Sequence, residues 1–118
     1  LSQPYTAAYA TTKHAAIGFA ESLAISHGDD GIKVSCLCPQ AVDTAMLGGT
    51  DGGSAGIDGI LSPAQVAQAV IDGLREESFL ILPHEQVEQY HLNKAQNYNR
   101  WIGGMRKLRR SMSPPKLP

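Results

Sequence analysis

The chain has 118 residues, of which 42% are hydrophobic and 18% are charged, and its formal net charge is -1 at pH 7. This length corresponds to about one domain, and the composition is typical of a globular protein rather than a disordered one. The near-neutral charge provides no basic field that would attract nucleic acid. Because no apolar run approaches the length of a membrane span, we expect no membrane partner and a cytoplasmic location.

The first predicted element is a helix over residues 4–27, where alanines recur and supply helix propensity. Gly28 is expected to end this helix. Residues 32–37 are rich in β-branched side chains and therefore predict a strand. Pro39 is expected to stop that strand, because proline cannot donate a backbone hydrogen bond to a neighbouring strand.

A long loop is predicted over residues 40–61, and its glycine-rich centre at 48–56 is expected to be the most mobile internal segment. The next helix is predicted to begin with Ser62 as its N-cap, Pro63 in the first helical position and Gln65 completing a capping box. The predicted buried stripe of this helix consists of Val66, Ala69, Val70, Gly73 and Leu74.

A short strand is predicted over residues 79–82, and a long helical pattern follows over residues 84–112. Two glycines at 103–104 weaken this pattern and are a candidate break. Residues 106–118 form a basic tail that we expect to be solvated and frayed. The helical pattern carries an apolar stripe of core or subunit contacts, formed by Tyr98, Trp101, Met105, Leu108 and Met112.

The order helix, strand, helix, strand, helix predicts an α/β architecture with a parallel sheet. Two parallel strands do not make a self-sufficient sheet, so we expect the remaining strands to come from elsewhere. The absence of an initiator methionine fits the same expectation. Residues 1–118 are therefore predicted to be the C-terminal part of one larger α/β domain, with about three helices and two strands.

Tyr9 and Lys13 lie four residues apart on the first predicted helix, so they share one face. A lysine ammonium near a phenol favours the phenolate, and a tyrosine in that setting can give and take a proton near neutral pH. The spacing alone is a weak signal, because Tyr90 and Lys94 repeat it. We interpret that second pair as the ordinary solvated face of a polar helix.

The residues around the first pair distinguish it from the second. The segment Tyr-Ala-Thr-Thr-Lys at 9–13 leads through the predicted strand to Pro-Gln-Ala-Val-Asp-Thr at 39–44. This succession resembles the compact, single-domain members of the short-chain dehydrogenase/reductase family, whose tyrosine–lysine helix leads into a strand that ends in Pro-Gly-x-Val-x-Thr. The resemblance is specific over residues 4–46 and looser up to residue 83. It implies the C-terminal portion of a doubly wound, Rossmann-like parallel sheet.

The resemblance implies a role for five residues. Tyr9 corresponds to the general acid/base that exchanges a proton with the substrate oxygen. Lys13 corresponds to the residue that favours the phenolate and holds the nicotinamide ribose hydroxyls. Val42 and Thr44 match positions that contact the nicotinamide carboxamide, through the backbone and the hydroxyl respectively, and Pro39 shapes the turn below the ring. For Thr44 an alternative stays open, in which the hydroxyl caps its own loop backbone.

The loop over residues 45–61 corresponds to the variable substrate lid of the family. Gln40 replaces the family's usual glycine, which would strain the backbone if the turn needs a positive φ. The family's catalytic serine lies thirteen residues before the tyrosine, a position that falls before Leu1. The glycine-rich dinucleotide loop is also absent from the sequence.

Two further groups of residues are interpreted as having no catalytic or metal-binding role. His84, Glu88 and His91 share one face of the last predicted helix, but such a trio is usually solvated surface, so we expect no metal site. Cys36 and Cys38 are too close in sequence for an unstrained disulfide, and we interpret them as small buried apolar side chains.

The sequence and the resemblance together predict an oxidoreductase that uses NAD or NADP for hydride transfer between a small-molecule alcohol and a ketone or aldehyde. The 118 residues by themselves are expected to be inactive and to associate as a homo-oligomer through the first helix. Two alternatives stay open. One is an NAD-dependent epimerase or dehydratase relative, and the other is a non-catalytic, truncated oligomerisation or interaction module.

Overall fold

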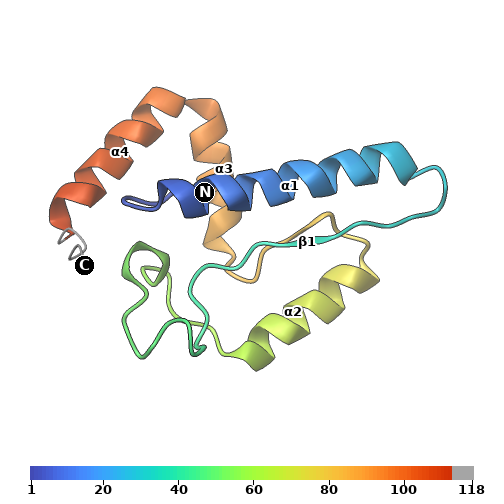
Figure 1. Cartoon of the computed structure of the whole chain (residues 1–118), viewed down its shortest axis with the longest axis horizontal. Helices are drawn as coiled ribbons and strands as arrows, with labels where there is room; N and C mark the ends of the chain where they lie inside the picture. The colour runs from blue at the N-terminus through green and yellow to red at the C-terminus, as the bar shows by residue number, and fades with distance from the viewer. Residues whose placement is uncertain (113–118) are drawn as a thin grey trace.

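A computed structural model describes residues 1–112 of the chain. The protein is α/β, as the sequence predicts (Figure 1). The strands are much shorter than the predicted runs over residues 32–37 and 79–82. The elements follow in the order α1 (Ala7–His27), β1 (Cys36–Leu37), η1 (Gly53–Ala55), α2 (Pro63–Arg75), β2 (Leu80–Ile81), α3 (Gln86–Gln96) and α4 (Tyr98–Ser111).

β1 and β2 form a two-stranded parallel sheet, in which Cys36 pairs with Leu80 and Leu37 pairs with Ile81. The amides of Cys36 and Cys38 both donate to backbone carbonyls on the β2 side, at 2.6 and 2.9 Å. Leu37, between them, therefore directs its own N–H and C=O to the opposite edge of β1. That edge has no strand partner among residues 1–112, as expected for part of a larger sheet.

α2 begins with the predicted capping box, since Ser62 and Gln65 exchange hydrogen bonds of 2.9 and 3.3 Å. Gly73 brings α2 close to β2, because a Cβ at this position would stand 2.6 Å from Cγ1 of Ile81. The expectation that Leu74 is buried in the same stripe is wrong. Leu74 is exposed, because the two-stranded sheet is too narrow to cover the whole stripe.

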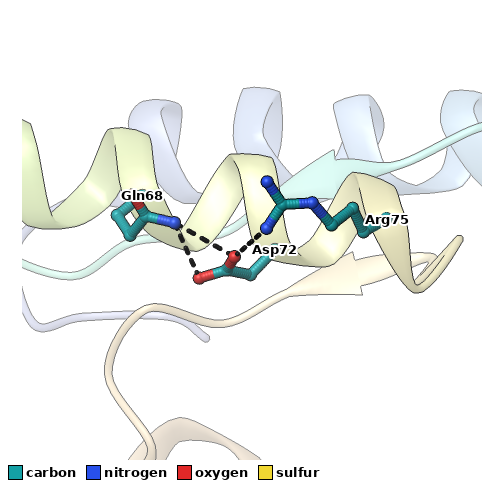
Figure 2. A network of polar contacts seen from close by, with 3 residues as sticks. All are labelled: Gln68, Asp72 and Arg75. Atoms are coloured by element: carbon teal, nitrogen blue, oxygen red, sulfur yellow. Dashed lines mark hydrogen bonds and ion pairs between the residues drawn. The ribbon is translucent and has the colours of Figure 1, made fainter.

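The solvent-facing side of α2 carries a small polar network (Figure 2). Asp72 accepts hydrogen bonds of 3.0 and 3.1 Å from Nε2 of Gln68, and one of 3.1 Å from Arg75. All three side chains are exposed, so the network contributes little to stability. It marks the face of α2 that points away from the strands.

α1 has no buried residue, although alanines and larger apolar side chains dominate it. Ile17, Ala20 and Ala24 form a half-buried stripe, whereas Ile25 is exposed and Phe19 is 68% exposed. A helix that is apolar on several sides is normally enclosed by other elements. Even so, neither α1 nor any other helix within residues 1–112 combines the length and the hydrophobicity of a membrane span.

The predicted third helix is in fact two helices, α3 and α4, which meet at an angle at Asn97 (Figure 1). Asn97 leaves the helical region, with φ −153° and ψ 91°, and its side chain caps α4 by accepting from the amide of Arg100 at 2.9 Å. The candidate break at residues 103–104 is therefore wrong, because both glycines lie inside α4. Residues 106–111 of the predicted tail also belong to α4, and residues 113–118 lie outside the described part of the chain.

Candidate active site

Tyr9 and Lys13 lie in the first two turns of α1, on the same side of the helix. The Nζ atom of Lys13 stands 5.3 Å from the centroid of the Tyr9 ring. Tyr9 is 54% exposed. Within residues 1–112, the Tyr9 hydroxyl has no hydrogen-bond partner and Lys13 takes part in no ion pair. Both polar groups are therefore free to meet a bound molecule.

The segment that follows β1 is held by a second short parallel pairing, in which Val42 bridges to Leu61. The amide of Leu61 donates to the carbonyl of Ala41 at 3.1 Å, and the amide of Asp43 donates to the carbonyl of Leu61 at 2.9 Å. In this geometry the N–H and C=O of Val42 point away from Leu61. They have no partner in the described part of the chain, so Val42 presents a free backbone donor and acceptor.

Thr44 starts a turn through its carbonyl, which accepts from the amides of Leu47 at 2.9 Å and Gly48 at 3.4 Å. The hydroxyl of Thr44 takes no part in these bonds, so it does not cap its own loop. The side chain is exposed. A hydroxyl in this position can donate to a ligand and accept from it.

Gln40 occupies the turn after Pro39 without the strain that its replacement of glycine suggested, since its φ is not positive. Its amide donates a hydrogen bond of 3.2 Å to Nδ1 of His84. The interpretation of His84 as solvated surface is wrong, because this residue is only 3% exposed. His84 follows β2 and Gln40 follows β1, and the ends of parallel strands meet at one edge of a sheet. Because the donor is a backbone amide, the identity of residue 40 gave no sequence signal for this contact.

The loop over residues 45–61 contains the short helix η1 and is attached at two points. The amide of Ala41 donates to the carbonyl of Ala55 at 3.3 Å. The hydroxyl of Tyr90, on α3, donates to Oδ1 of Asp58 at 2.8 Å. This hydrogen bond, together with partial burial, raises the pKa of Tyr90 above its usual value.

The interpretation of Tyr90 and Lys94 as a plain solvated face is also wrong. Tyr90 is turned toward the loop, and its ring lies 6.2 Å from that of Trp101. Lys94 lies over the ring of Tyr98, 5.1 Å from its centroid. The second tyrosine–lysine pair therefore uses its two side chains for separate packing contacts.

The candidate residues form two sets in the structure. No hydrogen bond or ion pair among residues 1–112 joins Tyr9 or Lys13 to Pro39, Val42 or Thr44. The first set lies on the opening turns of α1 and the second on the segment after β1. The described residues contain no cluster of His, Cys, Asp or Glu side chains that could hold a metal ion.

Both cysteines are free thiols; Cys36 begins β1 and Cys38 directly follows it. The thiol of Cys38 donates to Sγ of Cys36 across 3.9 Å. Burial, and then the neighbouring Cys36, raise the pKa of Cys38 to about 11. A thiol held protonated in this way is a poor nucleophile. The expectation that both cysteines are buried is wrong, since each is half-buried.

Comparison with known proteins gives a consistent result. Residues 1–53 match the family described as short chain dehydrogenase. The 17-beta-hydroxysteroid dehydrogenase 13 of Rattus norvegicus is 40% identical over 74 residues, which cover 60% of this chain and 24% of that protein. The 1-deoxy-11-beta-hydroxypentalenate dehydrogenase of Streptomyces exfoliatus is 40% identical over 77 residues, covering 64% and 28%. Epidermal retinol dehydrogenase 2 of Homo sapiens is 32% identical over 79 residues, covering 64% and 26%. No solved structure matches the chain significantly.

The chain spans about a quarter of the length of these curated relatives. The segment that matches the family, residues 1–53, contains both sets of candidate residues. These relatives come from two mammals and a bacterium, and all three are named as dehydrogenases. Residues 1–53 are therefore similar to the short-chain dehydrogenase family.

Proposed function

We propose that this chain contributes the acid/base part of an oxidoreductase that transfers a hydride between a small-molecule alcohol and the corresponding ketone or aldehyde, with NAD or NADP as cofactor. The observation that carries the proposal is the exposed Tyr9 phenol beside the ammonium of Lys13, within the segment that matches the family. The names of the relatives as dehydrogenases support the same reaction class.

In this proposal the Tyr9 hydroxyl exchanges a proton with the substrate oxygen, and Lys13 favours the phenolate. Lys13 would also hold the ribose hydroxyls of the cofactor. The cofactor, when bound, supplies or accepts the hydride. The exposure of Tyr9 supports this role, because a general acid/base must come within hydrogen-bond distance of its substrate.

The segment after Pro39 fits the nicotinamide end of such a cofactor. A carboxamide carries both donors and an acceptor, and Val42 offers an unpaired N–H and C=O while Thr44 offers an unpaired hydroxyl. The pyrophosphate needs a glycine-rich turn that directly opens a helix. Residues 48–56 do not fit that need, because they contain only the single turn η1 and α2 begins only at Pro63.

We assign the uncovered apolar surface of α1 to contacts with the rest of a Rossmann-like domain and with a second copy of the subunit. The exposure of Phe19 and Ile25 supports this assignment, since such a surface is costly to leave in water. The loop over 45–61 would act as the substrate lid. Its attachment through Asp58 and Ala55 leaves residues 47–51 joined only by local hydrogen bonds.

A Tyr9→Phe variant of the full-length protein tests the acid/base assignment. We expect kcat to fall by at least about 100-fold with unchanged affinity for NAD(P), because the phenol oxygen carries the proton and does not hold the cofactor. Tyr98→Phe is the control, since the Tyr98 hydroxyl has no hydrogen-bond partner within residues 1–112, and it should keep kcat. A Tyr9→Phe enzyme with nearly normal turnover would refute the assignment.

Calorimetric titration of the 118-residue chain with NAD+ and with NADPH tests the cofactor part of the proposal. We expect no saturable binding, because residues 48–56 do not form a pyrophosphate site. Saturable micromolar binding by the folded chain would mean that these residues do hold the cofactor and that the proposed division of the site is mistaken.

A further inference from the structure

An open recess lies between residues 2–5, the start of α1 and α4. Its volume is about 540 Å³, within the range of about 300–1,000 Å³ that is typical of small-molecule sites. Neither Tyr9 nor Lys13 lines it. We propose that this recess binds an amphipathic carboxylate, such as a medium-chain fatty acid, at a site separate from the proposed catalytic groups.

The apolar wall of the recess comes from α4. Tyr98, Trp101, Ile102 and Met105 line it, and their spacing places them on one face of the helix. Tyr98 is 56% exposed and Ile102 is 49% exposed. An aliphatic chain lying along this face would remove that surface from water, which is the main source of affinity for an apolar ligand.

Tyr5 forms the opposite wall, and its side chain contacts Arg109 on α4. Its φ of 63° is rare for a residue other than glycine. Its hydroxyl accepts a hydrogen bond of 3.3 Å from Nε of Arg109. The guanidinium carbon of Arg109 lies 5.7 Å from the centroid of the Tyr5 ring. These contacts join the two walls and present the remaining guanidinium N–H groups at the edge of the recess.

The charged side chains that line the recess are all basic. They are Lys94, Arg106 and Arg109, with His14 beside them, and no Asp or Glu lines the recess. The ion pairs within residues 1–112 lie elsewhere, so none of the described carboxylates neutralises these three cations. A ligand carboxylate would supply that missing charge, and a guanidinium can bind it through two parallel hydrogen bonds.

α4 is a basic amphipathic helix, and such helices also bind membrane surfaces. In this chain part of the apolar face of α4 is covered by other residues, since Trp101 and Met105 are half-buried while Tyr98 and Ile102 are exposed. Trp101 packs against Tyr90 of α3, and the same face lines the recess opposite Tyr5. A single amphiphile can enter between these walls, whereas a bilayer requires the apolar face to point outward. The arrangement therefore favours a monomeric ligand.

Trp101 is the only tryptophan among the 118 residues, so its fluorescence reports directly on the recess. The full chain would be titrated with dodecanoate, with neutral dodecanol and with dodecyltrimethylammonium, each below its micelle concentration. We expect a saturable change with dodecanoate, at least about tenfold weaker binding of dodecanol, and no binding of the cation. Absence of a saturable change with dodecanoate, or equal affinity for dodecanol, would overturn the proposal.

A matched pair of variants tests the position of the charge. Arg109→Gln should weaken dodecanoate binding by about tenfold. Arg100→Gln makes the same change in net charge on α4 but lies outside the recess, so it should have little effect. Equal losses of dodecanoate affinity in the two variants would show that the ligand is attracted by the overall charge of α4. That result would refute a specific carboxylate site at Arg109. A response to phosphatidylglycerol vesicles alone would identify α4 as a membrane-surface helix instead. Because no turnover is measured, these outcomes are independent of the proposed oxidoreductase activity.

Discussion

The backbone amide of Gln40 donates a hydrogen bond of 3.2 Å to Nδ1 of His84, which joins the turn after β1 to the turn after β2. Because Nδ1 is the acceptor, the neutral ring carries its proton on Nε2. Nε2 is buried without a partner in the described part of the chain, and so is Oε1 of Gln40. The bond therefore sets the spacing of the two strand ends just before Val42 and Thr44. This arrangement leaves two buried polar atoms without a hydrogen-bond partner in the described part of the chain.

Replacing His84 by alanine should lower the free energy of unfolding by about 1–3 kcal/mol, because the Gln40 amide loses its acceptor. Urea denaturation measures this change. His14→Ala is the control, since His14 is exposed, and its effect should stay within about 0.5 kcal/mol. Equal effects of the two substitutions would contradict the importance of the bond. In the wild-type chain, nitrogen NMR should show the proton of His84 on Nε2.

Gly73 and Gly103 offer a matched test of the contact between α2 and β2. Both glycines lie inside helices, so alanine gains about 1 kcal/mol of helix propensity at either position. At Gly73 the added methyl collides with Ile81, whereas nothing lies within 4 Å of a Cβ at Gly103. Gly73→Ala should therefore be less stable than Gly103→Ala by about 1–3 kcal/mol in thermal or urea unfolding. Equal stabilities would mean that α2 does not need its glycine.

Tyr90→Phe should release one end of the loop over 45–61, because it removes the hydrogen bond to Asp58. We expect a loss of about 1 kcal/mol in the free energy of unfolding and faster amide hydrogen exchange around Asp58. Tyr98→Phe is the control, as the Tyr98 hydroxyl has no partner within residues 1–112. Residues 48–56 should exchange quickly even in the wild-type chain, and strong protection there would contradict a mobile lid.

Cys38 should make stability fall at alkaline pH. Its pKa is about 11 in the folded chain against an ordinary value of 9.0. Since the folded state keeps the proton more tightly, the contribution of this thiol is complete below about pH 9 and is lost as the pH rises toward 11. Urea unfolding across this range should show the decline, and Cys38→Ala should reduce it.

The same shift predicts slow alkylation of Cys38 in the folded chain. A pKa raised from 9.0 to about 11 leaves about 100-fold less thiolate at pH 8. Mass spectrometry after iodoacetamide treatment would compare the folded chain with the chain in urea. Equal rates in the two conditions would show that the fold does not protect this thiol.

The features that the sequence determined by itself depend on near neighbours. Ser62 and Gln65 form the predicted capping box, because both partners lie within one helical turn. Tyr9 and Lys13 share one side of α1 for the same reason, since helix geometry alone brings residues four apart together. The α/β order and the similarity to the short-chain dehydrogenase family also followed from local patterns, and the family match covers residues 1–53.

The tertiary structure decided the features that join distant residues. His84 lies 44 residues from Gln40, Asp58 lies 32 residues from Tyr90, and Arg109 lies 104 residues from Tyr5. No local pattern specifies which distant side chain a buried donor will meet. Strand length has the same cause. The run over residues 32–37 predicts a strand, yet only Cys36 and Leu37 form β1, because a strand requires a neighbour to accept its hydrogen bonds.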